Sequence, residues 1–257
     1  KPAGRKPVVA TRIGDMAIDL STLAEAGYLE DLGLSDFQLF KAMVLNDFIA
    51  QGKETTGAVR SRLMELFGAD YTKLRQDEKT CSRALFPVGE VEVLLPVNIG
   101  DYTDFYSSIE HATNVGIMFR DPENALLPNW RHIPVGYHGR SSSIVVSGAE
   151  IHRPKGQLKP NDMDEPVFGS TRQLDFELEM AFVTGKETRL GETVPVEKAE
   201  EYIFGMVIFN DLSARDIQKW EYVPLGPFLS KNFGSVVSPW IVTLEALEPF
   251  RIHGPEQ

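Results

Sequence analysis

The sequence predicts a mainly β protein built from two domains. Short apolar segments flank Gly14-Asp15, a turn signal, so we expect the chain to open with a β-hairpin. From Val91 onward, short strand-like segments are separated by Gly, Pro and Asn at the spacing of an all-β roll or sandwich with few helices. These patterns predict a small N-terminal domain with β-structure and helices (residues 1–95), followed by a larger mixed β-roll domain (residues 96–257).

Two helices are expected in the N-terminal domain. The first is capped by Ser35 and ends at Gly52, and the second covers about residues 56–67 and stops at Gly68. Apolar residues recur at helical spacing in both. These are Phe37, Phe40, Val44 and Phe48 in the first helix, and Val59, Leu63 and Leu66 in the second.

Composition limits the partners. The chain has 37 acidic and 26 basic residues and a net charge of -11, so we expect neither nucleic acid nor a membrane surface as a partner. An anionic substrate would need a local pocket of Arg and Lys or a bound cation. The single cysteine, Cys81, forms no internal disulfide, and no long apolar run is present, so a cytoplasmic protein is expected.

Residues 174–182 alternate strictly between apolar and other side chains. This period of two predicts a half-buried strand with the apolar residues on one face and the acids on the other. An acidic strand face normally meets water. Alternatively, Glu177 and Glu179, which are neighbours on that face, hold a hard divalent cation. The alternation alone leaves both interpretations open.

Two further segments carry polar residues at the start of expected helices. Asp211 ends an apolar strand, and a helix follows in which Arg215 and Gln218 share a face, with Ser213 and Asp216 in a capping pattern. Elsewhere, Ser107 and Glu110 form a capping box that places His111 in a first helical turn, where the helix dipole favours a neutral imidazole that can act as a base.

Longer motifs make the chain recognisable. They are Asp-Tyr-Thr-Asp-Phe-Tyr-Ser-Ser at 101–108 with His111 and the stretch to Arg120, Pro-Val-Gly-Tyr-His-Gly-Arg at 134–140, and Trp-Glu-Tyr-Val-Pro-Leu-Gly-Pro-Phe-Leu before Ser230-Lys231. With these motifs the chain resembles the fumarylacetoacetate hydrolase family over most of residues 98–240. The resemblance implies an SH3-like N-terminal domain, more loosely matched, before a catalytic β-roll.

The resemblance also implies the site residues. The cation ligands would be Asp104, Glu177, Glu179 and Asp211, with Lys231 and Ser235 near a second cation. The substrate-binding residues would be Tyr106, Arg120, Tyr137, Gln218 and Tyr222. His111 would take the proton that generates hydroxide, and Arg215, Gln218 and Lys231 would face the developing negative charge. The cation would be Ca²⁺ or Mg²⁺.

The implied reaction is metal-dependent hydrolysis of a carbon–carbon bond in 4-fumarylacetoacetate, a small diketo diacid, by a cytosolic homodimer at the end of tyrosine and phenylalanine breakdown. Two alternatives stay open: a keto-acid decarboxylase or tautomerase of the same superfamily, and an inactive truncated fragment. Ser235 and Leu212 stand where the family usually has Thr and Trp. Because the family continues beyond Gln257, we expect the β-roll to be incomplete here.

Overall fold

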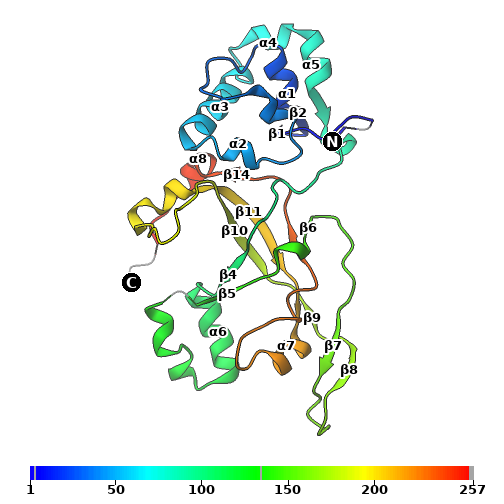
Figure 1. The fold of residues 1–257 in the computed structure, drawn as a ribbon, viewed down its shortest axis with the longest axis vertical. Helices are drawn as coiled ribbons and strands as arrows, with labels where there is room; N and C mark the ends of the chain where they lie inside the picture. The colour runs from blue at the N-terminus through cyan, green and yellow to red at the C-terminus, as the bar shows by residue number, and fades with distance from the viewer. Residues whose placement is uncertain (3, 134, 255–257) are drawn as a thin grey trace. The chain divides into compact units, whose positions relative to one another are not determined.

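The computed structural model describes residues 1–2, 4–133 and 135–254. The chain divides into two compact units: the first unit comprises Lys1–Asn98, Glu179–Phe209 and Val237–Gln257, and the second unit comprises Ile99–Leu178 and Asn210–Val236 (Figure 1). The first residue of the motif at 134–140 and the chain end at 255–257 lie outside the described residues. The division at residue 95 stays a prediction.

The N-terminal part of the first unit opens with the expected hairpin. Strands β1 (Ala10–Ile13) and β2 (Met16–Asp19) pair antiparallel across a turn in which Gly14 has φ 55, and β3 (Leu85–Pro87) pairs with the other edge of β2. The strand ends at Asp19 because the Asp19 side chain accepts a hydrogen bond from the backbone N–H of Thr22 and caps helix α1 (Leu20–Glu25).

Helices gather around this sheet (Figure 1). After α1 they are the 3₁₀ helix η1 (Phe37–Lys41), α2 (Asn46–Ile49), α3 (Lys53–Leu66), α4 (Thr72–Gln76), α5 (Glu78–Ala84) and the 3₁₀ turn η2 (Val88–Glu90). A common core, which includes Ile18, Leu23, Leu29 and Phe40, joins the sheet to the helices. With this much helix, the chain is a mixed helix and strand structure rather than a mainly β one, and the SH3-like assignment stays a prediction.

One expected helix of this region is wrong. The segment from Ser35 to Gly52 forms η1 and α2 with an extended break at Ala42, and Asp36 rather than Ser35 caps η1. After the break, backbone groups of this segment form hydrogen bonds with residues 96–98 instead of within a helix. The Leu45 N–H donates to the Pro96 carbonyl at 2.8 Å. Asn46 exchanges two hydrogen bonds with Asn98. The second expected helix is confirmed as α3, although it starts three residues earlier than predicted.

The rest of the first unit contains most of strands β10 (Leu178–Thr184) and β11 (Ile203–Asp211), which are sheet neighbours. Strand β14 (Val242–Thr243) pairs antiparallel with β11. The 3₁₀ helix η6 (Val196–Tyr202) leads into β11, and α8 (Leu244–Leu247) and η7 (Glu248–Phe250) follow β14.

The second unit is made of short antiparallel pairs. They are β4 (Thr103–Phe105) with β5 (Gly136–His138), β7 (Lys155–Leu158) with β8 (Val167–Ser170), and β9 (Leu174–Asp175) with β12 (Ser213–Ala214). Strands β6 (Ile144–Val146) and β13 (Ser235–Val237) are also sheet neighbours. Helices α6 (Ile109–Phe119) and α7 (Arg215–Glu221) and the 3₁₀ turns η3 (Pro122–Asn124), η4 (Pro128–Arg131) and η5 (Ser141–Ser143) connect them.

A small apolar cluster supports α7. Ile217 and Ala214 are buried against Leu158 of β7, with Val167 and Phe233 packed beside them. None of the helices in the described ranges has the length and apolar character needed to cross a membrane.

Candidate metal centre

Two strand pairs of the second unit bring acidic residues together. In the β4–β5 ladder Asp104 lies opposite Tyr137, and opposed residues of an antiparallel pair share a sheet face. The Tyr137 hydroxyl donates to Asp104 Oδ2 at 3.2 Å and to Asp211 Oδ2 at 2.9 Å. Strand β9 ends at Asp175 and its partner β12 begins at Ser213. Next to this pair, the Asp211 N–H donates to the Glu177 carbonyl at 3.1 Å. Local pairing therefore places the carboxylates of Asp104 and Asp211 on one tyrosine hydroxyl and the backbone of Glu177 beside Asp211.

The complete carboxylate cluster contains Asp104, Glu177, Glu179 and Asp211. Each offers one ligand atom, and these atoms lie within 4.8 Å of one another. Asp211 is buried, and the other three are partly buried. The four ligands that the resemblance implied are thus the ones that the structure groups.

Two acidic residues of segment 174–182, Glu177 and Glu179, are partly buried, whereas Asp175 is exposed. Phe176 and Leu178 are 67% and 74% exposed, but the Glu177 side chain is only 17% exposed. The default expectation, in which the acidic face meets water, is therefore wrong for Glu177 and Glu179. The reason is electrostatic: the inward face meets cations that stabilise buried carboxylates.

Two cations contact the carboxylate cluster. Lys231 Nζ lies 2.6 Å from both Glu177 Oε2 and Asp211 Oδ2, and the Lys231 side chain is 5% exposed. Arg215 Nη2 lies 2.6 Å from Glu177 Oε1, and Arg215 Nε lies 2.9 Å from Asp175 Oδ2. Arg215 also donates to Gln218 Oε1 at 2.9 Å, as expected for a pair on one helical face.

The helix that carries Arg215 is not capped as the sequence suggested. No side chain caps α7, and Ser213 lies in β12 with its hydroxyl donating to the Asp211 carbonyl. Asp216 instead accepts hydrogen bonds from the Thr171 hydroxyl and the Arg172 N–H. The Arg215 N–H at the start of α7 donates to the Gln173 carbonyl at 2.9 Å, so a backbone acceptor outside the helix is used where a side-chain cap was expected.

Burial and charge set the protonation states. Burial is the largest influence on Asp211 and raises its pKa to about 6, although Lys231 and the Tyr137 hydroxyl act in the opposite direction. Burial alone would raise the pKa of Glu177, but the neighbouring Lys231 and Arg215 outweigh it and the pKa is lowered. Burial, reinforced by the charges of Asp211 and Asp104, raises the pKa of Tyr137, so this phenol stays a hydrogen-bond donor.

The carboxylate cluster fits a hard divalent cation. Its ligands are all oxygens, which Mg²⁺ and Ca²⁺ prefer. Lys231 and Arg215 are the cations that contact the cluster of four carboxylates through the ion pairs seen here, and Arg215 is shared with Asp175. Lys231 contacts one oxygen of Asp211, while the other lies 3.4 Å from the Ser235 hydroxyl. An added cation would offset the remaining negative charge.

The remaining predicted residues lie on or near α6 and α7 without joining the carboxylate cluster. His111 is in the first turn of α6 as expected, although Ser108 rather than Ser107 accepts the hydrogen bond from the His111 N–H. The His111 ring meets Tyr106 edge-on at 5.3 Å between centroids. Arg120 donates twice to the Ala125 carbonyl, and Tyr222 is exposed. Within the described ranges, no hydrogen bond or ion pair links these four side chains to the cluster.

Sequence reasoning missed two residues of the site. The Tyr102 hydroxyl donates to Asp104 Oδ2 at 3.0 Å, and Asp175 binds Arg215. Both stand two positions from a predicted ligand, Tyr102 from Asp104 and Asp175 from Glu177. Spacing by two places side chains on one strand face, so this signal could have found them.

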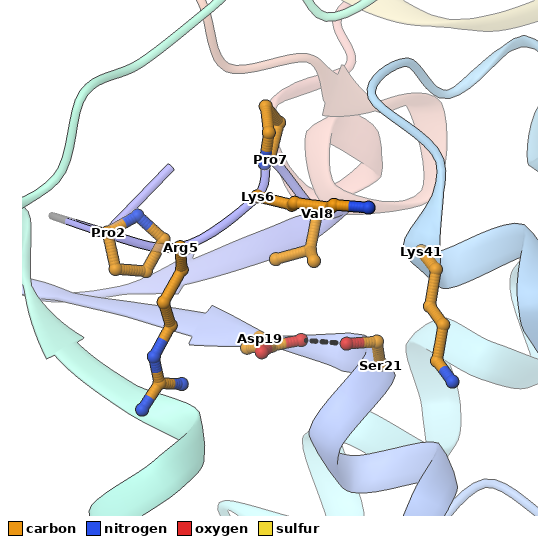
Figure 2. A pocket seen from close by; sticks show the side chains of 8 residues that line it. All are labelled: Pro2, Arg5, Lys6, Pro7, Val8, Asp19, Ser21 and Lys41. Carbon is orange, nitrogen blue, oxygen red and sulfur yellow. Dashed lines mark hydrogen bonds between the residues drawn. The ribbon is translucent and has the colours of Figure 1, made fainter.

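A cavity of about 250 Å³ lies in the first unit (Figure 2). Its lining includes Arg5, Lys6, Lys41 and Asp19 and none of the predicted site residues. The Asp19 carboxylate already accepts hydrogen bonds from Ser21 and Thr22, and Lys41 pairs with Glu25 at 2.9 Å. These groups serve helix capping and surface ion pairing, so the carboxylate cluster remains the candidate site.

Comparison with known proteins assigns the chain to a family. The family model described as the C-terminal part of fumarylacetoacetate (FAA) hydrolase matches residues 102–253. The chain belongs to the fumarylacetoacetate hydrolase family. The model described as the N-terminal part of fumarylacetoacetase matches residues 1–96.

Curated members of the fumarylacetoacetate hydrolase family resemble nearly all of this chain. The fumarylacetoacetases of Bos taurus and Homo sapiens are 51% and 52% identical to it over 98% of its length, and that of Dictyostelium discoideum is 53% identical over 97%. The chain spans 58–60% of the length of these relatives. Among solved structures, a fumarylacetoacetate hydrolase of Exiguobacterium antarcticum has a TM-score of 0.52 at 20% identity over 93% of this chain and 63% of that one, a likeness of fold.

Proposed function

We propose that this chain carries the metal-dependent hydrolysis of a carbon–carbon bond in 4-fumarylacetoacetate, giving fumarate and acetoacetate, the last step of tyrosine and phenylalanine catabolism. The main support is its 51–53% identity to three fumarylacetoacetases over 97–98% of its length. The oxygen-only carboxylate cluster with adjoining Lys231 and Arg215 is consistent with this reaction.

The reaction needs a nucleophile at one ketone and stabilisation of the enolate that departs. Asp104, Glu177, Glu179 and Asp211 would hold Mg²⁺ or Ca²⁺, with Lys231 and Ser235 beside it. When bound, the cation would polarise the ketone oxygens and offset the developing negative charge. The acidic cluster thereby becomes compatible with a dianionic substrate.

The other residues supply proton transfer and orientation in this proposal. His111, in the first turn of α6, would take a proton from the attacking water. Tyr137 remains a phenol donor, Arg215 and Lys231 donate to the two oxygens of Glu177, and Gln218 Oε1 accepts from Arg215. Arg215, Gln218 and Lys231 would face the developing negative charge. Tyr106, Arg120 and Tyr222 would hold the ends of the substrate together with Tyr137 and Gln218. The protein would act as a cytoplasmic homodimer.

The reaction is tested with protein produced from the whole gene. Loss of the ultraviolet absorbance of the diketone should follow enzyme addition, stop with EDTA and return with Mg²⁺ or Ca²⁺. Oxaloacetate and an acylpyruvate serve as competing substrates. Turnover that EDTA does not affect, or a steady preference for oxaloacetate, would contradict the proposal.

Residue roles are tested by His111→Ala and Glu179→Gln. The loss of a general base should lower kcat by about 10²- to 10⁴-fold with unchanged cation affinity. The loss of a ligand charge should lower cation affinity first, measured by calorimetry. His152→Ala, at an exposed loop histidine, is the matched control and should leave both quantities unchanged. A near-normal kcat in folded His111→Ala would remove histidine from the mechanism.

A further inference from the structure

The loop between α7 and Lys231 has few of the interactions that usually fix a backbone, although the Gly226 N–H donates to the Tyr222 carbonyl at 2.6 Å. Residues 223–229 belong to no helix or strand pair, and the segment contains Pro224 and Pro227, which have no N–H, and Gly226 at φ 90. Val223 and Leu225 are 68% and 93% exposed, so side-chain burial contributes little there. Nevertheless this loop leads into Lys231, whose ammonium group is positioned within 2.6 Å of two carboxylates.

One carboxylate holds the end of this loop. Glu221, the last residue of α7, accepts hydrogen bonds at Oε1 from the Phe228 N–H at 2.8 Å, the Ser230 N–H at 2.8 Å and the Ser230 hydroxyl at 2.5 Å. Its Oε2 atom accepts from the Leu229 N–H at 3.0 Å. Three backbone donors in the four residues before Lys231 thus converge on one side chain. Hydrogen bonds to an ionised acceptor are among the stronger ones in proteins.

The residues fixed by Glu221 are those that carry Lys231. Ser230 is fully buried, and its carbonyl accepts the Ala214 N–H at 2.9 Å, which ties the loop to β12. The Phe228 carbonyl accepts the Lys231 N–H at 3.1 Å. A lysine side chain has four rotatable bonds and a large conformational entropy, so two short contacts at its tip require a fixed backbone at its base.

Helix stability does not explain a glutamate at this position. A negative charge at the C-terminal end of a helix faces the negative end of the helix dipole, which is unfavourable. The hydrogen bonds to the loop compensate for this placement. Glu221 therefore stabilises the loop rather than the helix.

We infer that Glu221 is a positioning residue that holds Lys231 within the carboxylate cluster. It acts through the backbone of residues 228–230 and is not one of the four carboxylates of the cluster. The effect of Glu221 on catalysis rests on the proposed function, whereas its effect on the position of the Lys231 side chain does not.

The test measures the reactivity of the Lys231 amine in metal-free protein. Wild type and Glu221→Gln are acetylated briefly with acetic anhydride, and the labelling of each lysine is followed by peptide mass spectrometry. Glutamine has the same shape but offers one acceptor oxygen, so it leaves loop donors without partners. Labelling of Lys231 should accelerate by about tenfold or more in Glu221→Gln, because local opening exposes it.

The matched control is Asp77→Asn. Asp77 also accepts several hydrogen bonds, from the Thr80 N–H, the Thr80 hydroxyl and the Tyr28 hydroxyl, and it caps α5 in the first unit. This variant should lose stability and keep Lys231 protected. Unchanged protection of Lys231 in Glu221→Gln would overturn the inference, as would equal labelling in both variants.

Activity gives a second readout. Glu221→Gln should lower kcat, and the same change in a Lys231→Met background should lower it no further, because the positioned group is already absent. Additive losses would overturn the inference. If wild type shows no hydrolysis, the proposed function fails, and the labelling experiment still decides the role of Glu221.

Discussion

Replacing Lys231 with methionine removes a cation from the carboxylate cluster and keeps most of the side-chain stem. In wild type the Lys231 ammonium is 2.6 Å from both Glu177 and Asp211, whose side chains are 17% and 1% exposed. The variant leaves two largely buried carboxylates facing each other without this cation. Breaking a buried pair in this way leaves an uncompensated charge, which is strongly destabilising.

The magnitude follows from burial. The substitution removes two attractions at 2.6 Å and leaves the mutual repulsion of the two carboxylates in place. Removing one partner of a buried ion pair costs about 3–5 kcal/mol. We therefore expect the free energy of unfolding of Lys231→Met to fall by about 3–5 kcal/mol without metal.

The assay is urea denaturation in EDTA at about pH 8, above the pKa of Asp211, which burial raises to about 6. Excess Mg²⁺ or Ca²⁺ should shrink the difference from wild type, because the cation replaces the lost charge. Lys186→Met is the control: its 3.3 Å ion pair with Glu201 is exposed, so its loss should cost at most about 1 kcal/mol. A Lys231→Met stability within about 1 kcal/mol of wild type would refute the electrostatic reasoning.

Other changes test neighbouring features. Tyr137→Phe removes the hydroxyl shared by Asp104 and Asp211 and should lower the free energy of unfolding by about 1–3 kcal/mol in urea; an unchanged value would show that the two acids find other donors. Burial would raise the pKa of Asp216, but its hydrogen bonds, led by the one from the Thr171 hydroxyl, lower it. The ionised Asp216 therefore stabilises the folded protein at a pH above the pKa of Asp216 in the unfolded chain. This stabilisation is lost as the pH falls through the pKa of Asp216 in the folded protein. Asp216→Asn should therefore cost about 1 kcal/mol at pH 7, and the difference should vanish in acid; a constant difference across pH would contradict the assignment. Gly116→Ala should destabilise α6 by about 1–3 kcal/mol or more, because its Cβ would lie 2.1 Å from the Ala125 carbonyl oxygen. Gly57→Ala in α3, with nothing within 4 Å, should instead stabilise by about 0.5–1 kcal/mol in the same thermal and urea melts, and equal effects of the two changes would refute the steric argument.

Local chemistry predicted several elements correctly. The turn at Gly14 favours a hairpin through its local backbone geometry, and the periodicity around Val59 and Leu66 predicts α3. The first turn of α6 follows from a serine followed by an acid, with an error of one residue in the cap. Such features depend on hydrogen bonds and side-chain spacing within a few residues, which the sequence contains in full.

The sequence by itself also determined which residues could form the site. Alternation placed Glu177 and Glu179 on one face, and helical spacing paired Arg215 with Gln218. Only the tertiary structure decided which face of that segment is buried, since an alternating pattern is the same in either orientation. Lys231 and Tyr137 decide which face of the segment is buried, because they supply partners for carboxylates on the acidic side. Both are distant in sequence from these carboxylates. The break at Ala42 and the loop fixed by Glu221 have the same origin: their partners come from other segments, and no local pattern encodes a hydrogen bond to a distant backbone group.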